Sequence, residues 1–228
     1  MKAALSVIAL VLLALILPFF LPSGGPDKAN MEQNLPWQIS VDEQGRSQVF
    51  GLTLGSSTLA DVRQHLGQEL EVAIIAAPDE VGSLEGYYAQ LPLGFILGRL
   101  ILTLEQDPDK INAMRERALK AEHMESTTKK ITLHPEDLAR AEQTPVQAIS
   151  LIPSVNLDEA TLIQRFGQPA EKIQLSETLT HYLYPAKGLD IVLDTKGKEL
   201  LQYVQPREFE SRIRAPLLAR QKEAAPAK

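Results

Sequence analysis

The chain has 228 residues, a formal net charge of −6 at pH 7 and no cysteine. This mildly acidic balance excludes a broad nucleic-acid surface, which needs clustered Lys and Arg to replace phosphate counterions. The absence of cysteine excludes disulfides, thiolate zinc sites, cysteine nucleophiles and lipid attachment through an N-terminal cysteine.

The chain begins with a strongly hydrophobic stretch. Lys2 precedes the run from Ala3 to Leu21, which is interrupted only by Ser6 and Pro18. About 20 apolar residues cross a bilayer as a helix, so residues 1–22 predict a transmembrane anchor, with a cleaved signal peptide as the alternative. The charge at Lys2 favours a cytoplasmic N-terminus. The sequence therefore predicts a single-pass protein of the cytoplasmic (inner) membrane, with its body in the periplasm.

A polar stretch and a strand pair follow the hydrophobic run. Residues 23–36 are rich in Ser, Gly, Pro, Asp and Asn and predict a flexible tether. The first folded unit, residues 37–105, begins with alternation of apolar and polar residues from Trp37 to Val41, as in a half-buried strand. A polar turn with a late glycine then leads into a partner strand from Gln48 to Leu54.

A short amphipathic helix is predicted within Ser57–Gln68, because serines can cap its start and Gly67 can end it. The same pattern of apolar positions and a terminal glycine returns one hundred positions later, in Leu157–Gln168. We interpret the two segments as an internal duplication, with the second unit at residues 148–205.

The segment Leu91–Leu104 is unusually apolar, although its glycines and proline favour strands and turns over a helix. We interpret it as a pair of core strands that are covered on both faces. In the alternative interpretation, one strand face is open and meets a partner or the membrane surface.

Residues 106–147 predict a charged helical insertion between the two units. Asp107–Pro108 opens a surface helix that continues to Met124, and a strand is expected at Lys129–Leu133. A short helical turn is expected over residues 135–142.

The second unit reads as strands around turns. Strands are predicted at residues 171–175 and 178–184, and a hairpin joins Leu189–Asp194 to Glu199–Val204 across a polar turn with glycine. Residues 206–228 form a basic tail that is expected to be partly helical. Together the segments predict an α+β fold, in which an N-terminal transmembrane helix is followed by two tandem helix-plus-antiparallel-sheet repeats.

In each unit a helix that ends in Gly-Gln precedes strands and a turn. The positions that carry this pattern are Thr58, Val62, Leu66 and Gly67 in the first unit, and Leu162, Phe166, Gly167, Pro169, Tyr182, Tyr184, Gly197 and Leu200 in the second. The pattern resembles the small outer-membrane assembly lipoproteins of the SmpA/OmlA type, and also the tandem fold of β-lactamase inhibitory protein. The resemblance implies an exported helix-on-sheet module that acts by binding protein. The chain departs from the lipoproteins because it has no lipobox cysteine.

No local motif for catalysis is present in the sequence. The four histidines are not spaced as metal ligands, and His181 is expected to be hydrogen-bonded or exposed. Asp190 and Asp194 are interpreted as exposed hairpin residues. The Gly51–Ser57 segment lacks the lysine of a phosphate-binding loop, and no Gly-x-Ser-x-Gly elbow occurs. We therefore expect no enzymatic activity, no cofactor and no metal.

The predicted function is that of a membrane-anchored periplasmic protein-binding module, an envelope assembly or accessory factor with envelope or membrane proteins as partners. Aromatic residues dominate binding surfaces, which makes five of them candidate partner contacts, with core packing as the alternative. They are Tyr87, Tyr88, Phe95, Tyr182 and Tyr184. Two other functions stay open: an apolar or lipid ligand bound along Leu91–Leu104, and an exported enzyme inhibitor.

Overall fold

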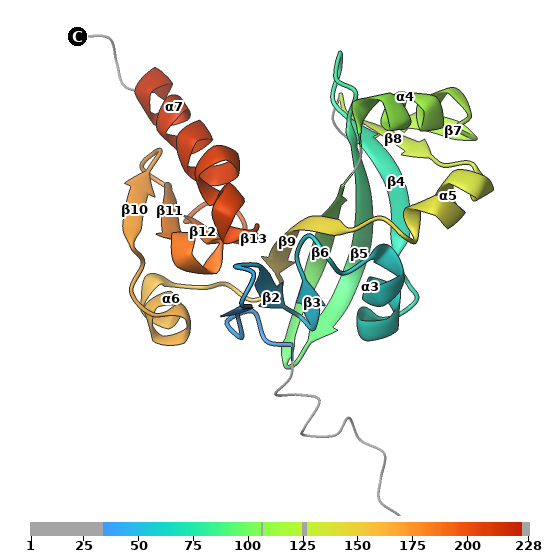
Figure 1. Ribbon diagram of the computed structural model, residues 1–228. Coiled ribbons are helices and arrows are strands. Elements are labelled where there is room, and N and C mark those ends of the chain that lie inside the picture. The colour runs from blue at the N-terminus through green and yellow to red at the C-terminus, as the bar shows by residue number, and fades with distance from the viewer. Residues whose placement is uncertain (1–33, 106, 125–126, 225–228) are drawn as a thin grey trace, which may run out of the picture.

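The computed structural model describes residues 34–105, 107–124 and 127–224, and strands dominate them (Figure 1). One sheet has ten strands, all paired antiparallel, in the order β10-β11-β12-β13-β9-β6-β5-β4-β8-β7. These strands are β4 (Glu71–Ala76), β5 (Ser83–Leu93), β6 (Ile96–Leu104), β7 (Lys120–His123), β8 (Lys129–Thr132), β9 (Val146–Pro153), β10 (Glu171–Gln174), β11 (Leu179–Tyr184), β12 (Leu189–Asp194) and β13 (Leu200–Tyr203).

The predicted α+β class with an N-terminal transmembrane helix is wrong. Strands from both predicted units and from the insertion join in one sheet, and the helices are few and short. No helix in the described ranges is long and apolar enough to cross a bilayer. The predicted single-pass location in the cytoplasmic membrane, with a periplasmic body, depended on such a helix and is corrected on the same finding. The proposed anchor at Ala3–Leu21 lies outside the described residues.

The helices α3 (Leu59–Leu66) and α6 (Glu159–Phe166) begin with side-chain caps. In α3 the Thr58 hydroxyl accepts from the backbone N–H of Asp61, while the Asp61 carboxylate accepts from the backbone N–H of Thr58 at 2.8 Å. In α6 the Asp158 carboxylate accepts from the backbone N–H of Thr161 at 2.7 Å. These contacts satisfy N–H groups that the first turn of a helix leaves without partners.

The two helices also end alike. Gly67 and Gly167 follow them with φ values of 108° and 86°. Residues that have a Cβ atom rarely adopt positive φ values of this kind. The hydroxyl of Tyr88 on β5 donates to the Gly67 carbonyl at 2.5 Å. The hydroxyl of Tyr184 on β11 donates to the Gly167 carbonyl at 2.8 Å. A tyrosine from the second strand after each helix thus fixes the helix end to the sheet.

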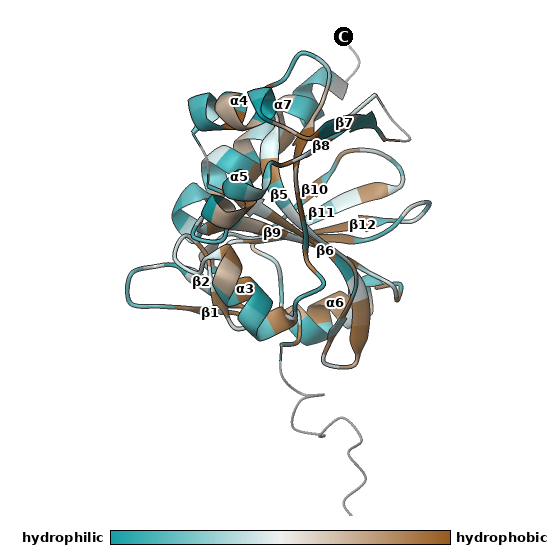
Figure 2. Cartoon of the chain, turned by 90° about the vertical axis from the view of Figure 1, so that its right-hand side faces the viewer, coloured by the Kyte–Doolittle hydropathy of each residue, from teal (hydrophilic) through white to brown (hydrophobic). Residues whose placement is uncertain are grey.

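A large core lies on the side of the sheet that faces α3 and α6, here called the α3 side. Helices α4 (Pro108–Glu116) and α5 (Pro135–Ala141) cover the same side and contribute Ile111, Met114 and Ala141. Figure 2 shows these helices in front of the strands. Leu100 and Leu102 of β6 are fully buried in this core, which fixes the orientation of the alternating strand.

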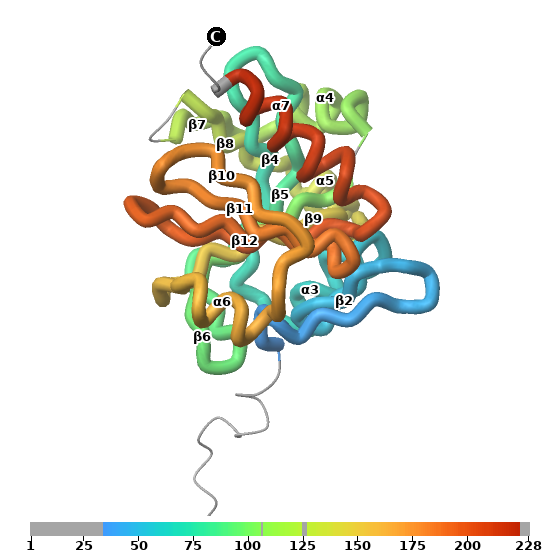
Figure 3. Tube along the Cα trace, turned by 90° about the vertical axis from the view of Figure 1, so that its left-hand side faces the viewer, coloured from blue at the N-terminus to red at the C-terminus, as the bar shows by residue number. Residues whose placement is uncertain are grey.

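A second core lies on the opposite side, here called the α7 side. The chain after β13 forms a 3₁₀ turn η2 (Pro206–Glu208), a π-helical turn η3 (Glu210–Arg214) and α7 (Ala215–Ala224). Ile213 and Leu217 pack with Leu183 of β11 and Ile173 of β10. Figure 3 shows α7 beside the strands β10 and β11. The described part of the predicted basic tail is therefore packed on the sheet.

The predicted helix from Asp107 to Met124 ends early. Helix α4 stops at Glu116, and the chain then forms β7, which pairs with β8. The expected strand at Lys129–Leu133 is present as β8, and it pairs with β4. The insertion thus contains the helices α4 and α5, the second of them at the expected helical turn, and it also adds the strands β7 and β8 to the sheet.

A small three-stranded sheet precedes α3. It consists of β1 (Ser40–Val41), β2 (Ser47–Val49) and β3 (Leu52–Thr53). The buried Ser47 hydroxyl donates to the carbonyl of Lys187 at 2.7 Å, which joins this sheet to the turn before β12. The Tyr203 hydroxyl donates to the carbonyl of Pro36 at 3.0 Å.

Candidate functional site

The α7 side of the sheet is open over the N-terminal strands. Within the described ranges no helix covers this side of β4, β5 and β6, although α7 covers it over β10 and β11. A cleft of about 460 Å³ lies there. Its lining residues, which define the cleft below, are Glu71, Ala73, Ile75, Glu85, Tyr87, Arg99, Ile101, Met124, Thr128 and Lys130.

Strand register brings the cleft residues together. Glu71 of β4 lies opposite Tyr87 of β5, and Tyr87 lies opposite Ile101 of β6. The side chains of Tyr87, Ile101 and Ile75 are only partly buried, whereas their neighbours on the α3 side are fully buried. The floor of the cleft is therefore apolar and partly accessible to solvent.

Charged groups stand around this floor. The Lys130 ammonium lies 2.5 Å from the Glu71 carboxylate. Burial raises the pKa of Glu85, and a hydrogen bond of 2.6 Å from the Ser83 hydroxyl partly opposes that rise. Arg99 is exposed, and no carboxylate in the described part of the chain pairs with it. The rim thus combines the Glu71–Lys130 ion pair, the desolvated carboxyl group of Glu85 and the unpaired guanidinium of Arg99.

The five aromatic residues predicted as partner contacts are separated by the fold. Tyr87 lies in the cleft. Tyr88, Tyr182 and Tyr184 are buried on the α3 side, with 2%, 4% and 5% of their surface exposed. Their burial raises the pKa of each hydroxyl to about 12, with the Glu159 carboxylate adding to this for Tyr182. Phe95 is exposed at the turn between β5 and β6.

Phe95 belongs to a second apolar surface, at the tip of the β5–β6 hairpin. Its ring lies 5.8 Å from that of Trp37, and the Arg165 guanidinium lies 4.8 Å from the Trp37 ring centre. Leu97 and Val155 are also exposed. The two residues are close to one another, because the backbone N–H of Ser154, which precedes Val155, donates to the Leu97 carbonyl. Figure 2 shows this hairpin tip in hydrophobic colours. The Trp37 ring packs against part of this patch.

The segment Leu91–Leu104 contributes to both surfaces. Its expected pair of strands is present, but the expectation that both faces are covered is wrong. Along β6 buried residues alternate with exposed or half-buried ones, including Arg99 and Ile101. The open face agrees with the alternative interpretation of this segment. Arg99 and Ile101 belong to this segment, whereas Ile75 and Lys130 were in no predicted site, because only strand pairing brings them to it.

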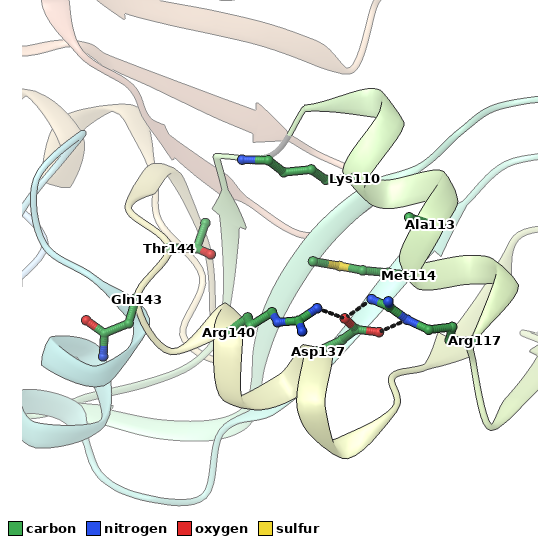
Figure 4. Close-up of a pocket in the computed structure, with 8 residues that line it drawn as sticks. All are labelled: Lys110, Ala113, Met114, Arg117, Asp137, Arg140, Gln143 and Thr144. Carbon is green, nitrogen blue, oxygen red and sulfur yellow. Dashed lines mark hydrogen bonds and ion pairs between the residues drawn. The ribbon is translucent and has the colours of Figure 1, made fainter.

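A polar pocket of about 460 Å³ lies between α4 and α5 (Figure 4). Asp137 is fully buried there and accepts hydrogen bonds from Arg117, at 3.2 Å from Nε, and from Arg140 at 3.5 Å. Lys110 lines the same pocket. Since both guanidinium groups are directed at Asp137, we interpret the arrangement as an ionic clamp between the two helices.

A buried pair on β11 and β12 corrects one further expectation. Asp190, expected to be exposed, is fully buried, and its carboxylate lies 2.8 Å from Nδ1 of His181. Desolvation raises the pKa of Asp190, and the contact with His181 partly opposes the rise. In the described ranges no hydroxyl group hydrogen-bonds to His181, and no cluster of three potential metal ligands occurs. The pair therefore lacks the nucleophile that a hydrolytic site needs.

Comparison with known proteins gives no family for the chain: no protein-family model, no curated protein and no solved structure matches it. The geometry of the cleft is therefore the basis for proposing a function.

Proposed function

We propose that the chain is a protein-binding module without catalytic activity, and that the cleft on the α7 side is its binding surface. The observation that supports this most directly is the incomplete cover of the sheet. The same side is covered by α7 over β10 and β11, but no helix of the described residues covers it over β4, β5 and β6.

The distribution of polar groups favours a protein partner. The cleft has an apolar floor of Ala73, Ile75 and Ile101, with charged side chains at its edges. Protein interfaces commonly have an apolar centre and a polar rim, with tyrosine and arginine enriched, and both residue types occur here. Small-molecule sites instead direct a few polar groups at one point, and the floor of the cleft offers no such group.

An apolar small molecule or lipid is the second candidate. The cleft volume of about 460 Å³ lies within the usual range for ligand pockets. The test must therefore identify the chemical class of whatever contacts the cleft.

The test uses photo-crosslinking in the native host. The full chain carries p-benzoylphenylalanine in place of Tyr87 and is irradiated in cells, and the adduct is identified by mass spectrometry. Two variants disable the cleft: Ile101→Lys places a charge on the floor, and Ala73→Trp fills it. Phe95→Ala is the matched control, because it removes an exposed aromatic ring from the hairpin tip.

We expect the photo-crosslinker at position 87 to form one protein adduct. This adduct should be absent in both cleft variants and present in Phe95→Ala. The two purified proteins must then form a complex of defined stoichiometry, with the same response to the variants. A lipid or small-molecule adduct would assign the cleft to the second candidate. An adduct that is lost only in Phe95→Ala would place binding at the hairpin tip and overturn the assignment to the cleft. Circular dichroism spectra of each variant establish that it is folded.

A further inference from the structure

We propose that the cleft receives an amphipathic helix that carries a basic residue, in the way the C-terminal half of the sheet receives α7. This inference rests on the proposed function and adds the shape and chemistry of the partner segment.

Strand pairing shows that the cleft and the seat of α7 are equivalent positions. In the C-terminal half, Glu171 pairs with Leu183. In the N-terminal half, Glu71 pairs with Tyr87. Both pairs lie on the first two strands after a glycine-terminated helix, and the next residues, Tyr184 and Tyr88, make the matching hydrogen bonds to the helix ends. Glu71 and Tyr87 are therefore the counterparts of Glu171 and Leu183.

The remaining contacts of α7 extend this equivalence. Ile173 and Leu175 pack in the second core, and they correspond to Ala73 and Ile75 two and four residues into β4. The smaller Ala73 leaves space at a position where Ile173 supports α7. The four positions on the seat of α7 thus have counterparts that line the cleft.

An ionic contact accompanies the apolar ones. Arg214 of η3 lies 2.7 and 3.3 Å from the two carboxylate oxygens of Glu171, so the guanidinium engages both. The counterpart Glu71 is held by Lys130 from β8, and the desolvated Glu85 lies in the same cleft. A partner cation placed as Arg214 is would reach Glu71 and reduce the cost of the Glu85 charge. The equivalence of Glu71 with Glu171, the partner of Arg214, therefore predicts a basic residue in the docked helix.

A helix suits the site better than an added strand. Strand β4 is paired with β5 on one side and with β8 on the other, so its backbone groups at the cleft are already used. A partner must therefore lie across the face of the sheet. A helix satisfies its own backbone hydrogen bonds and can bury one apolar stripe there, whereas an extended segment would leave its peptide groups without partners.

The spacing of the required stripe follows from residues 209–217, which lead through η3 into α7. Phe209, Ile213 and Leu217 are buried at intervals of four residues, and Arg214 follows the central one. A synthetic peptide of residues 207–223 of this chain is therefore a suitable probe, because it carries the stripe and the arginine. A scrambled peptide of the same composition controls for nonspecific attraction.

The experiment titrates the full chain into the fluorescent peptide and follows anisotropy, and NMR spectra of the ¹⁵N-labelled chain locate the contact. We expect shift changes around Tyr87 and Ile101, and a loss of affinity of about tenfold or more in Ile101→Lys. The Arg214→Ala peptide should bind about threefold or more weakly. Phe95→Ala should leave the affinity unchanged.

Three results would overturn the inference. The peptide could fail to bind at concentrations of about 1 mM, the scrambled peptide could bind equally well, or the shift changes could lie only around Ile173 and Leu183, which would indicate exchange with α7. Each of these would leave the proposed function standing if the cross-link from position 87 to a protein persisted. If position 87 gave no cross-link to a protein but the peptide still bound around Tyr87, the proposed function alone would be refuted.

Discussion

The two tyrosines that hold the helix ends provide a direct test of the matched geometry. Tyr88→Phe and Tyr184→Phe each remove one hydrogen bond to a glycine carbonyl while they keep the buried ring. A net hydrogen bond contributes about 1 kcal/mol. Gly67 and Gly167 are exposed, so water can reach the released carbonyls. The expected loss for each variant is therefore about 1 kcal/mol, without a larger penalty for an unpaired buried group.

The two losses should add. Strands β5 and β11 are five steps apart in the sheet order, which at about 4.8 Å per step places them about 24 Å from one another. Changes at this distance act independently, so the double variant should lose about 2 kcal/mol. For a chain of this size the corresponding fall in Tm is about 4–8 °C.

Urea unfolding, followed by circular dichroism, measures these differences. The matched control is Tyr87→Phe, because Tyr87 neighbours Tyr88 in sequence and its hydroxyl makes no hydrogen bond within the described ranges. This control should change the free energy of unfolding by less than about 0.3 kcal/mol. A Tyr88→Phe loss no greater than that of the control, or a double variant far from the sum, would refute the equivalence of the two helix ends.

Two further predictions concern charged groups. Asp137→Asn should lower the free energy of unfolding by about 2 kcal/mol, because it removes the negative charge that pairs with both Arg117 and Arg140. The neighbouring Glu136→Gln is the control. Equal urea midpoints for the two variants would contradict the ionic clamp. Glu85 has a folded pKa above its ordinary value of 4.5, so the folded state holds the proton more tightly and the contribution of Glu85 to stability falls as pH rises from about 4.5 through the folded pKa. Urea titrations from about pH 4 to 8 should therefore show Glu85→Gln gaining stability relative to the parent chain as pH rises, and a difference that is constant with pH would contradict the burial of this carboxyl group.

Local features of the fold could be predicted from the sequence. The hairpin of β12 and β13 was expected from two β-prone runs around Thr195–Lys198, and the ends of α3 and α6 were expected from Gly67 and Gly167. In these segments the residues that determine the structure are close neighbours. Their turn and cap preferences are satisfied by local backbone geometry alone.

Features that depend on distant pairing could not be predicted. Ala121 fell within the helix predicted to continue to Met124, but it lies opposite Ile131 in the β7–β8 pair. Asp190 was expected to be exposed because the sequence does not show that His181 lies beside it under the second core. The cleft escaped prediction for the same reason, since Ile75 and Ile101 approach only through the order β4-β5-β6.

The two end strands of the large sheet affect how the molecule behaves at high concentration. An unpaired strand edge can template pairing with another chain and so begin aggregation. In the described ranges the end strands β7 and β10 have only four residues each. All four residues of β7 are exposed, with Lys120 and Glu122 in an ion pair, and β10 carries Glu171 and Lys172. Short, charged edges of this kind oppose the stacking of sheets into fibrils, so a wide sheet can persist as a separate molecule.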